Sequence, residues 1–509
     1  MDRGAGRDAD DARALGRLGY AQELLRRMGG FSSFAVSFSI ISVLTGCITA
    51  YSDAIGPGGP AALGIGWPIV SAGTMLVALA MAELASAFPT AGALYHWSAL
   101  LGGPGAGWLT AAINVTGQLA IVAAIDFGCA SELAATLGLD ASSPSAPPLV
   151  RAAPLLLLAA ILASHALVNA LSVRLVAALN DLSATVHIAG VIAIVAALLA
   201  FGRAQPVSFL AHTGFTTRPD GDHVLGFLGG LVLSMFTFTG YDASAHLAEE
   251  THDPARRTAW GIVSSVAVSA VAGYLLLSAV TLGITDLRAV AADAHAPLLV
   301  MRGVLGDTGG RAAMGLALAA MWFCGLSSVT SASRTVYAFA RDGGLPGSRF
   351  VGRVDERTRT PLVAIAVVTG GPLLLVLGTA PFAAALFDAM AKMATMALYV
   401  SYAIPILLGI LARRRGLWKT LGPFNLRGFG VPVACAAVVW SGFVLAVCSL
   451  PPNQLPAGML GALVSVLAIV YFTLVRGRFA GPKVRLVNLE ATPSGEARGG
   501  REAPVSRAK

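Results

Sequence analysis

Long apolar stretches recur along almost the whole chain and are separated by short polar segments. Because a helix rises about 1.5 Å per residue and the hydrocarbon core of a bilayer is roughly 30 Å thick, about 20 apolar residues make one membrane span. We therefore expect an all-α polytopic membrane protein with twelve transmembrane helices. The predicted spans lie at about residues 31-51, 65-88, 106-136, 152-173, 178-201, 223-248, 259-284, 312-340, 361-379, 382-411, 430-450 and 456-475.

The segments between the predicted spans leave no room for a folded soluble domain. We expect an N-terminal segment over residues 1-30, a transmembrane domain over 31-475 and a disordered tail over 476-509, which is rich in Gly, Pro, Glu and Arg. The stretch from Ala93 to Leu101 is too short to span and is expected to form an amphipathic helix at the membrane surface. The N-terminal segment lacks an apolar core followed by a cleavage site, so the first span is expected to direct insertion.

Two threonine-glycine pairs interrupt apolar stretches that otherwise have the length of membrane-spanning helices. Thr45-Gly46 lies near the middle of the first span, and Thr239-Gly240 lies within the sixth. Backbone N–H and C=O groups freed by a break cannot face hydrocarbon, so a break occurs where protein or a polar cavity satisfies them. Paired breaks at corresponding positions of two repeats are the best sequence indication of a transporter's binding site.

The two breaks would place complementary backbone groups around one cavity. A half-helix that begins after a break points free N–H groups at the cavity, which suits a carboxylate. A half-helix that ends before a break points free C=O groups there, which suits an ammonium group or a sodium ion. Phe236 precedes the second break and offers a ring face to an ammonium group. Packing is the alternative, because glycine is a common close-packing residue in membrane helices, as in Gly226-x-x-x-Gly230.

Composition and charge agree with a membrane location. Hydrophobic residues make up 56% of the chain and charged residues 12%, which leaves too little polar surface to cover a soluble globule. Arginine and lysine gather at both ends and in the loops that the twelve-span topology places on the same side, which predicts cytoplasmic termini. This asymmetry explains most of the net charge of +8, so we expect contact with anionic membrane lipid and no nucleic-acid partner.

A few polar residues inside the predicted spans are candidates for gating or ion coupling. Asp242 follows the second break directly. His187 in the fifth span titrates near neutral pH and is a candidate for proton coupling, with a hydrogen-bonded structural role as the alternative. Ser327 and Ser328 in the eighth span are candidates to supply oxygens to a sodium ion, with hydrogen bonds to their own helix as the alternative.

Five groups of residues follow one another in an order that is typical of one transporter family. They are Phe38 to Gly46 with Gly58-Gly59-Pro60 and Gly66-Trp67; Met81 to Ser86 with Pro89 to Gly92 and Tyr95-His96-Trp97; Gly240 to Ala243 with His246 and Glu249-Glu250-Thr251; Ser333-Arg334 with Ala338 to Gly343 and Leu345-Pro346; and Ser401 to Pro405. Over about residues 30 to 430 the chain thus resembles the amino acid-polyamine-organocation (APC) superfamily of permeases, and most closely its amino acid/choline transporter branch.

The resemblance implies a five-plus-five inverted repeat with discontinuous helices 1 and 6. The repeats would cover about residues 31-201 and 223-411, with helices 11 and 12 appended at about 430-475. Asp242 matches the acidic residue after the second break, and the motifs at Glu83 to Gly92 and Arg334 to Pro346 are expected to form contacts at the cytoplasmic ends. The positions that match the family's substrate-binding residues are Thr45, Gly46, Phe236, Thr239 and Gly240.

In function, the resemblance implies a secondary active transporter that moves an amino acid, or a related amine such as gamma-aminobutyrate, across the plasma membrane by alternating access with proton or sodium coupling. A carrier of choline, ethanolamine or polyamines, or an exchanger without ion coupling, remains an alternative.

An enzyme is disfavoured because the histidines are scattered singly, and no metal or cofactor is expected. A channel is disfavoured because no repeated selectivity element lines a pore. The 4 lysines against 31 arginines, with abundant alanine and glycine, favour a GC-rich, bacterial genome.

Overall fold

The computed structural model describes residues 11–139, 145–379, 384–451 and 453–482. Within these ranges the ordered elements are helices, and the pairing between extended segments is limited to an isolated bridge that joins Met28 to Thr251. The predicted all-α class is therefore confirmed for the described part of the chain. Most of the predicted tail over 476–509 lies outside the described residues.

Eleven described helices are long and apolar enough to cross a membrane, and they coincide with eleven of the predicted spans. The first is divided between two consecutive helices, and the others are single. They are α2 (Gly30–Ile41) with α3 (Val43–Thr49), α5 (Gly66–Ala87), α7 (Pro104–Thr136), α8 (Pro148–Leu171), α9 (Val173–Phe201), α12 (Pro254–Leu282), α14 (Ala296–Arg341), α16 (Leu362–Thr379), α17 (Ala384–Arg414), α18 (Gly430–Val447) and α19 (Gln454–Val470).

The sixth predicted span contains a shorter apolar helix, α10 (His223–Thr237). After α10 the chain turns and then forms the four-residue helix α11 (Ala243–His246), followed by the 3-10 helix η2 (Ala248–Glu250). Eleven of the twelve predicted spans are thus matched by helices of membrane-crossing length. At the sixth predicted span the chain breaks after α10, so no single described helix there reaches that length, and a crossing by this broken segment stays a prediction.

Local sequence signals set where many of these helices begin. Proline occupies the first turn of α7, α8, α12 and α14, where its missing N–H leaves no intrahelical hydrogen bond unmade. Ser172 caps α9 by accepting from the amide of Arg174, and Asp222 caps α10 in the same way. The long α14 bends at Gly306, where φ is 74°, so its membrane-spanning part follows that residue, as the predicted span at 312–340 does.

Two shorter helices complete the outer parts of the bundle. α4 (Tyr51–Gly64) occupies the stretch between the first two predicted spans, with a kink at Gly59, where φ is 63° and ψ −171°. α6 (Ala93–Gly102) forms where a short helix was expected, but eight of its ten residues are buried and it packs on α7 and α17. It is therefore part of the helix packing, with Tyr95 and Trp97 buried, and its position at the membrane surface stays a prediction.

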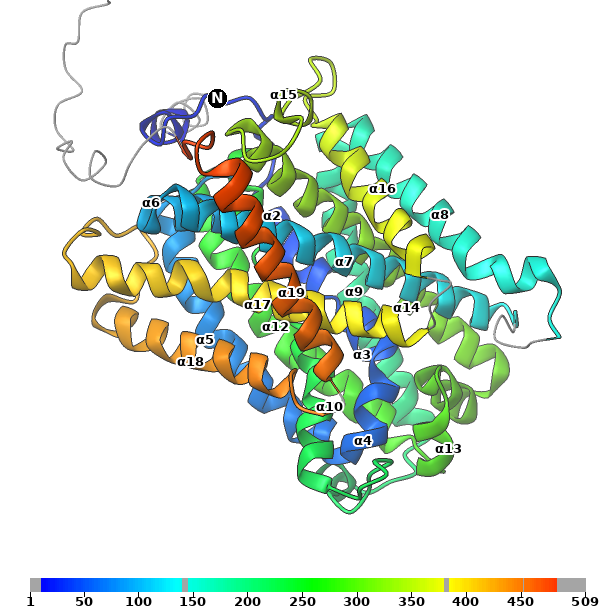
Figure 1. Cartoon of the computed structure of the whole chain (residues 1–509). Helices are drawn as coiled ribbons and strands as arrows, with labels where there is room; N and C mark the ends of the chain where they lie inside the picture. The colour runs from blue at the N-terminus through cyan, green and yellow to red at the C-terminus, as the bar shows by residue number, and fades with distance from the viewer. Residues whose placement is uncertain (1–10, 140–144, 380–383, 452, 483–509) are drawn as a thin grey trace, which may run out of the picture.

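Burial falls from the centre of the bundle to its edge. Of the first span, α2 and α3, 89% is buried inside the protein, against 6% of the span that includes α19. Figure 1 shows α2 and α3 surrounded by other helices and α19 crossing the outside. The N-terminal segment and α15 (Ser348–Val351) lie at one end of the molecule, and α4 and α13 (Leu287–Ala292) lie toward the other end. The arginine-rich chain around α15 therefore lies at the same end as the N-terminal segment (Figure 1).

Candidate functional site

The first span breaks at Ser42, three residues before the predicted Thr45-Gly46 pair. Ser42 has φ 33° and ψ 80°, and it ends α2 and caps α3. Its hydroxyl accepts from the amide of Thr45 at 3.3 Å and contacts the hydroxyl of Thr45 at 2.6 Å. The prediction that the first span breaks at Thr45-Gly46 is therefore wrong. Both residues lie inside α3, because the cap formed by Ser42 stabilises a break three residues earlier in the chain.

Gly46 instead marks a close approach between two helices. A Cβ atom at this position would lie 2.7 Å from Thr237 Cβ in α10, closer than real Cβ contacts. The missing side chain of Gly46 therefore lets α3 pack directly against the last turn of α10.

The break in the sixth span falls where the sequence predicted it. α10 ends at Thr237, and Gly240 has φ 89°, a conformation that favours glycine. A Cβ atom at Gly240 would also lie 3.1 Å from Ile40 Cβ, in the last turn of α2. The two breaks therefore contact each other at the centre of the bundle.

A small pocket lies where the two broken spans meet α7 and α14. Its free space, about 10 Å³ for the centre of a water-sized sphere, corresponds to roughly one water molecule. Four of the predicted substrate-binding residues, Thr45, Gly46, Phe236 and Thr239, line this pocket, and Gly240 follows directly behind Thr239. The remaining lining residues are Ile40, Ile41, Ile121, Ile125, Thr237 and Cys324.

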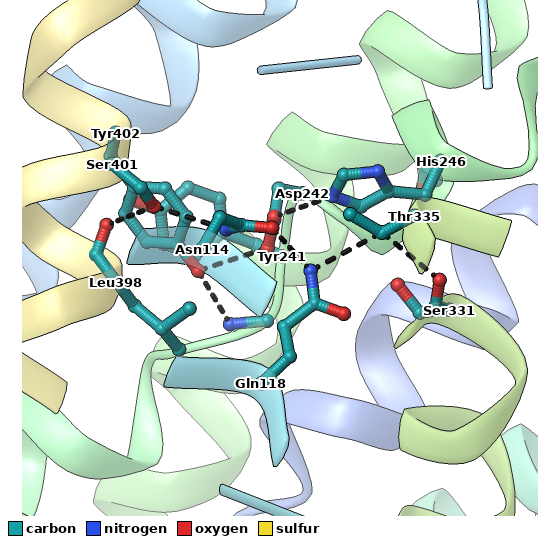
Figure 2. Close-up of polar contacts among 12 residues, drawn as sticks. Asn114, Gln118, Tyr241, Asp242, His246, Ser331, Thr335, Leu398, Ser401 and Tyr402 are labelled. Atoms are coloured by element: carbon teal, nitrogen blue, oxygen red, sulfur yellow. Dashed lines mark hydrogen bonds and ion pairs between the residues drawn. The ribbon is translucent and has the colours of Figure 1, made fainter. Parts of the chain in front are cut away.

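Asp242 anchors a buried polar network directly after the second break (Figure 2). Its two carboxylate oxygens contact the hydroxyl of Tyr402 at 2.9 Å and Nε2 of His246 at 3.0 Å. The Tyr402 hydroxyl also accepts from the amide of Gly240 at 3.1 Å. Tyr402 on α17 therefore holds the broken segment through two hydrogen bonds.

Sequence reasoning selected Asp242 but neither of its partners as a site residue. His246 lies four residues after Asp242, a spacing that joins side chains on one helix face and so gave a local signal. Tyr402 is 160 residues away, and no local pattern connects it with Asp242.

A second polar chain runs beside this network and joins three helices (Figure 2). Asn114 of α7 donates to the hydroxyl of Ser401 on α17 at 3.0 Å. Gln118, one turn later on α7, donates to the side-chain oxygen of Asn114 at 2.6 Å and to the hydroxyl of Thr335 on α14 at 3.3 Å. These contacts connect α7, α14 and α17 beside the segment after the second break.

His187 contacts the serine at the first break. Its Nε2 lies 2.7 Å from the Ser42 hydroxyl, and its Nδ1 lies 2.8 Å from the carbonyl oxygen of Ser183, one turn earlier in α9. The ring is fully buried. Hydrogen bonding, the structural alternative for His187, is therefore present, and a role in proton coupling stays a prediction.

Ser327 and Ser328 both donate hydrogen bonds to carbonyl oxygens of their own helix, at 2.9 and 2.8 Å. Ser327 is also 2.7 Å from the side-chain oxygen of Asn180 on α9. These contacts fit the backbone-bonding alternative, and a sodium site at the two serines stays a prediction. Among the residues that the structure describes, no group of three or more His, Cys, Asp or Glu is placed to hold a metal ion.

Ion pairs join α14 to η2 close to the N-terminal segment. Arg334 and Glu250 form a pair at 2.7 Å with both side chains at most 1% exposed, and Arg341 pairs with Glu249 at 2.9 Å. The amide of Arg27 donates to the carbonyl oxygen of Glu250 at 2.8 Å. The motif around Arg334 thus forms contacts among α14, η2 and the chain before α2.

Comparison with known proteins agrees with this architecture. A family model described as "Amino acid permease" matches residues 28–474. The chain is 36% identical over 468 residues to the amino-acid permease BAT1 homolog of Oryza sativa subsp. japonica, which covers 88% of this chain and 89% of that relative. It is 34% identical over 506 residues to the amino-acid permease BAT1 of Arabidopsis thaliana, and this match covers 92% of this chain and 95% of that relative.

A third relative is the GABA-specific permease of Saccharomyces cerevisiae, 27% identical over 514 residues, with 95% of this chain and 87% of the relative covered. These relatives are eukaryotic, so they lend no support to the predicted bacterial origin.

The helical bundle, its membrane-length apolar helices and the family match over almost all of that bundle describe one kind of molecule. The chain belongs to the amino acid permease family of the APC superfamily, and is a multi-pass membrane transporter and not an enzyme.

Proposed function

We propose that this permease is a secondary active carrier that moves an amino acid, such as gamma-aminobutyrate, by alternating access at the pocket between the two breaks. The observation that carries this proposal is the contact between the breaks, with Gly240 against the last turn of α2 and the pocket beside them. Broken helices that meet near the midplane are the arrangement in which transporters of this kind bind substrate. Thr45, Gly46, Phe236, Thr239 and Gly240 are the proposed substrate-binding residues.

The lining of the pocket favours a substrate that brings its own carboxylate. The pocket residues include no acidic side chain, and the nearby Asp242 is already engaged by Tyr402 and His246. A purely cationic substrate, such as choline or a polyamine, would therefore meet only backbone carbonyl groups and the ring of Phe236. A zwitterion finds partners in both the amides and the carbonyls that the breaks release.

Transport requires the pocket to open, because its free space is far smaller than an amino acid. Phe236 is the only aromatic residue in the lining, and it is partly buried, so its ring is the proposed gate over the substrate. The ion pairs of Arg334 and Arg341 are the proposed contacts that open toward the cytoplasm. In this proposal the two repeats, about 31–201 and 223–411, move against each other, and α18 and α19 stay outside them.

Uptake by purified protein in proteoliposomes tests the proposal. We expect saturable, competitor-sensitive uptake of at least one amino acid from a panel that also includes choline, ethanolamine and polyamines, at two pH values with and without sodium. Gly46→Leu and Gly240→Leu are expected to abolish substrate binding in correctly inserted protein, because each side chain would fill the contact between the breaks. Unsaturable flux, or unchanged affinity in both variants, would contradict the proposal. Uptake that occurs only when the proteoliposomes are preloaded with substrate would indicate an exchanger.

A further inference from the structure

A buried acid–imidazole pair joins two helices close to the pocket. His165 on α8 places Nδ1 at 3.2 Å from Oδ2 of Asp126 on α7, and both side chains are completely shielded from solvent. The other polar atom of each group, Oδ1 of Asp126 and Nε2 of His165, has no hydrogen-bond partner. Ionisable groups inside a membrane protein are costly, and they mark ion and proton pathways when nothing else explains them.

The pair lies against α14 at a glycine that allows the contact. A Cβ atom at Gly325 would lie 2.6 Å from Cε1 of His165 and 2.9 Å from Cγ of Asp126. Backbone of α14 therefore covers the carboxylate and the imidazole directly. The three helices α7, α8 and α14 pack on one another on the right side of Figure 1.

Asp126 of the pair and the glycine that covers it are next in sequence to residues that line the pocket. Ile125 precedes Asp126 and lines the pocket, and Cys324 precedes Gly325 and also lines it. The thiol of Cys324 contacts the carbonyl oxygen of Ile40 at 3.3 Å, in the last turn of α2. A shift of α14 away from the pair would therefore also change the contact between α14 and the first break.

Few other ionisable groups face the pair. Cys129 on α7 and Cys324 on α14 interact electrostatically with Asp126, and both are buried thiols. Glu132, further along α7, is engaged by His295 at 2.9 Å. From α9, which packs on α8, His187 contacts Ser42 and Ser183, and α16 carries no ionisable residue between Leu362 and Thr379. No other cation or anion is thus in contact with the Asp126–His165 pair among the described residues.

We propose that the Asp126–His165 pair binds the proton that is transported together with the substrate, with Nε2 of His165 as the atom that takes it. The inference rests on the proposed function, because it names the coupling ion and the site of that carrier. In this proposal Nδ1 carries a hydrogen and donates it to the ionised Asp126 carboxylate, which can only accept, so Nε2 keeps its lone pair and accepts the transported proton.

Charge explains how the site couples to movement. When His165 takes a proton, the pair consists of one carboxylate and one imidazolium and has no net charge, which suits the closed environment under α14. When the proton leaves Nε2, the carboxylate keeps an uncompensated charge, which favours a conformation in which water reaches the pair. Proton release therefore requires α14 to separate from α7 and α8, and the same movement alters the contact of Cys324 with the first break.

Two kinds of transport measurement separate a coupling role from a structural one. In proteoliposomes, a pH gradient that is acidic outside is expected to make the unmodified carrier accumulate substrate above equilibrium. Asp126→Asn and His165→Gln are expected to reduce this accumulation by about tenfold or more and to flatten the dependence of uptake on pH between about pH 6 and about pH 8. Both variants keep counterflow of labelled against unlabelled substrate, because binding and movement do not need the gradient.

Matched variants identify the histidine responsible. His212→Gln, on an exposed loop where His212 stacks on Phe209, is expected to behave as the unmodified carrier. His187→Gln tests a second buried histidine that contacts the first break, and loss of driven accumulation there but not in His165→Gln would overturn the proposal. Normal accumulation in Asp126→Asn would also overturn it.

The remaining outcomes are also decisive. If the unmodified carrier shows saturable uptake that a pH gradient does not drive, this inference fails and the proposed carrier stands. If it shows no saturable uptake, the proposed function itself fails. The double variant Asp126→Asn with His165→Gln carries no charge at the pair and is examined if the single variants do not insert. If none of the three inserts while His212→Gln does, the pair is structural and the proposal falls.

Discussion

Single residues decide where the two central helices break. Ser42 adopts positive φ in the first span although it is not a glycine, and its hydroxyl replaces part of the missing helical hydrogen bonding. Gly240 has positive φ in the second break and also allows the close approach of Ile40. The two breaks are thus made by different means, one by a cap and one by the absence of a side chain.

Gly240→Ala is expected to destabilise the protein, because alanine would adopt an unfavourable backbone conformation and meet Ile40. The expected cost is about 1–3 kcal/mol, measured as a lower Tm of the detergent-purified protein, together with weaker uptake. Gly229→Ala is the control, because a Cβ atom at that position of α10 meets nothing within 4 Å. An unchanged Tm in Gly240→Ala would show that the break does not need glycine.

Ser42→Ala removes the cap of α3 together with the contact to His187. We expect a loss of about 0.5–2 kcal/mol of stability and a lower substrate affinity, because the amides at the start of α3 lose their fixed position. Tm and binding isotherms measure the two effects. Ser465→Ala on α19 is the control, because its exposed hydroxyl bonds only to its own helix. Equal Tm values and equal substrate affinities in Ser42→Ala and Ser465→Ala would contradict the role of Ser42 as the cap of α3.

Elements are joined by a small number of buried charged contacts. Arg334 near the end of α14 and Glu250 of η2 are both buried, whereas Arg302 and Asp307 form a pair that is 46% and 55% exposed. Loss of one partner lowers stability more in a buried ion pair than in an exposed one. In the buried pair the remaining charge has neither its partner nor water around it, whereas in the exposed pair water solvates it.

Arg334→Met is therefore expected to destabilise the protein by about 3–5 kcal/mol, since Glu250 would stay buried without its partner. Arg302→Met, the matched exposed substitution, is expected to cost about 1 kcal/mol or less. Thermal unfolding of both variants gives the comparison. Similar Tm values for the two would mean that Glu250 gains water or another partner.

The loop between α13 and α14 gives a prediction about pH. A hydrogen bond with Glu132 is the main cause that raises the pKa of His295 above its ordinary value, and burial opposes the shift. A raised pKa in the folded state means that protonated His295 stabilises the fold below about pH 6.5, and that this stabilisation is lost as pH rises through the raised pKa. The Tm difference between the unmodified protein and His295→Gln is expected to be larger at about pH 5.5 than at about pH 8.5. A difference that grows toward alkaline pH would contradict this sign.

The whole molecule is organised around the first span, which is its most buried membrane helix. The helices at the edge of the bundle are far less buried, and the pocket lies where α2, α3, α7, α10 and α14 meet. The N-terminal segment and the chain around α15, which contain several arginines, lie at one end of the bundle, and α4, which contains no arginine or lysine, lies toward the other (Figure 1).

The proposed orientation puts the α15 end in the cytoplasm, and labelling of introduced cysteines tests it. A membrane-impermeant maleimide added to intact cells is expected to react with Thr213→Cys, in the loop after α9, and to react with Arg349→Cys only after the membrane is opened. Both positions are exposed, whereas four of the five native cysteines are buried and one is partly buried. If Arg349→Cys reacts in intact cells and Thr213→Cys reacts only after the membrane is opened, the α15 end lies outside the cell and the proposed orientation is wrong.

The sequence predicted the spans well because each depends on a local property, the length of an apolar run. It placed the break at Gly240 for the same reason, since a glycine beside a polar residue interrupts such a run. It placed the first break at Thr45-Gly46 instead of Ser42, because the left-handed conformation of a serine depends on partners that lie elsewhere, including His187 on α9.

Length, apolar pattern and charge asymmetry, all readable along one chain, determined by themselves that this is a helical membrane protein with two interrupted spans. The tertiary structure alone decided which side chains meet. It brought Tyr402 to Asp242 across 160 residues and His165 to Asp126 across 39, and it put both breaks on one pocket. The physical reason is that hydropathy acts on each segment separately, whereas hydrogen bonds and ion pairs depend on how the segments pack.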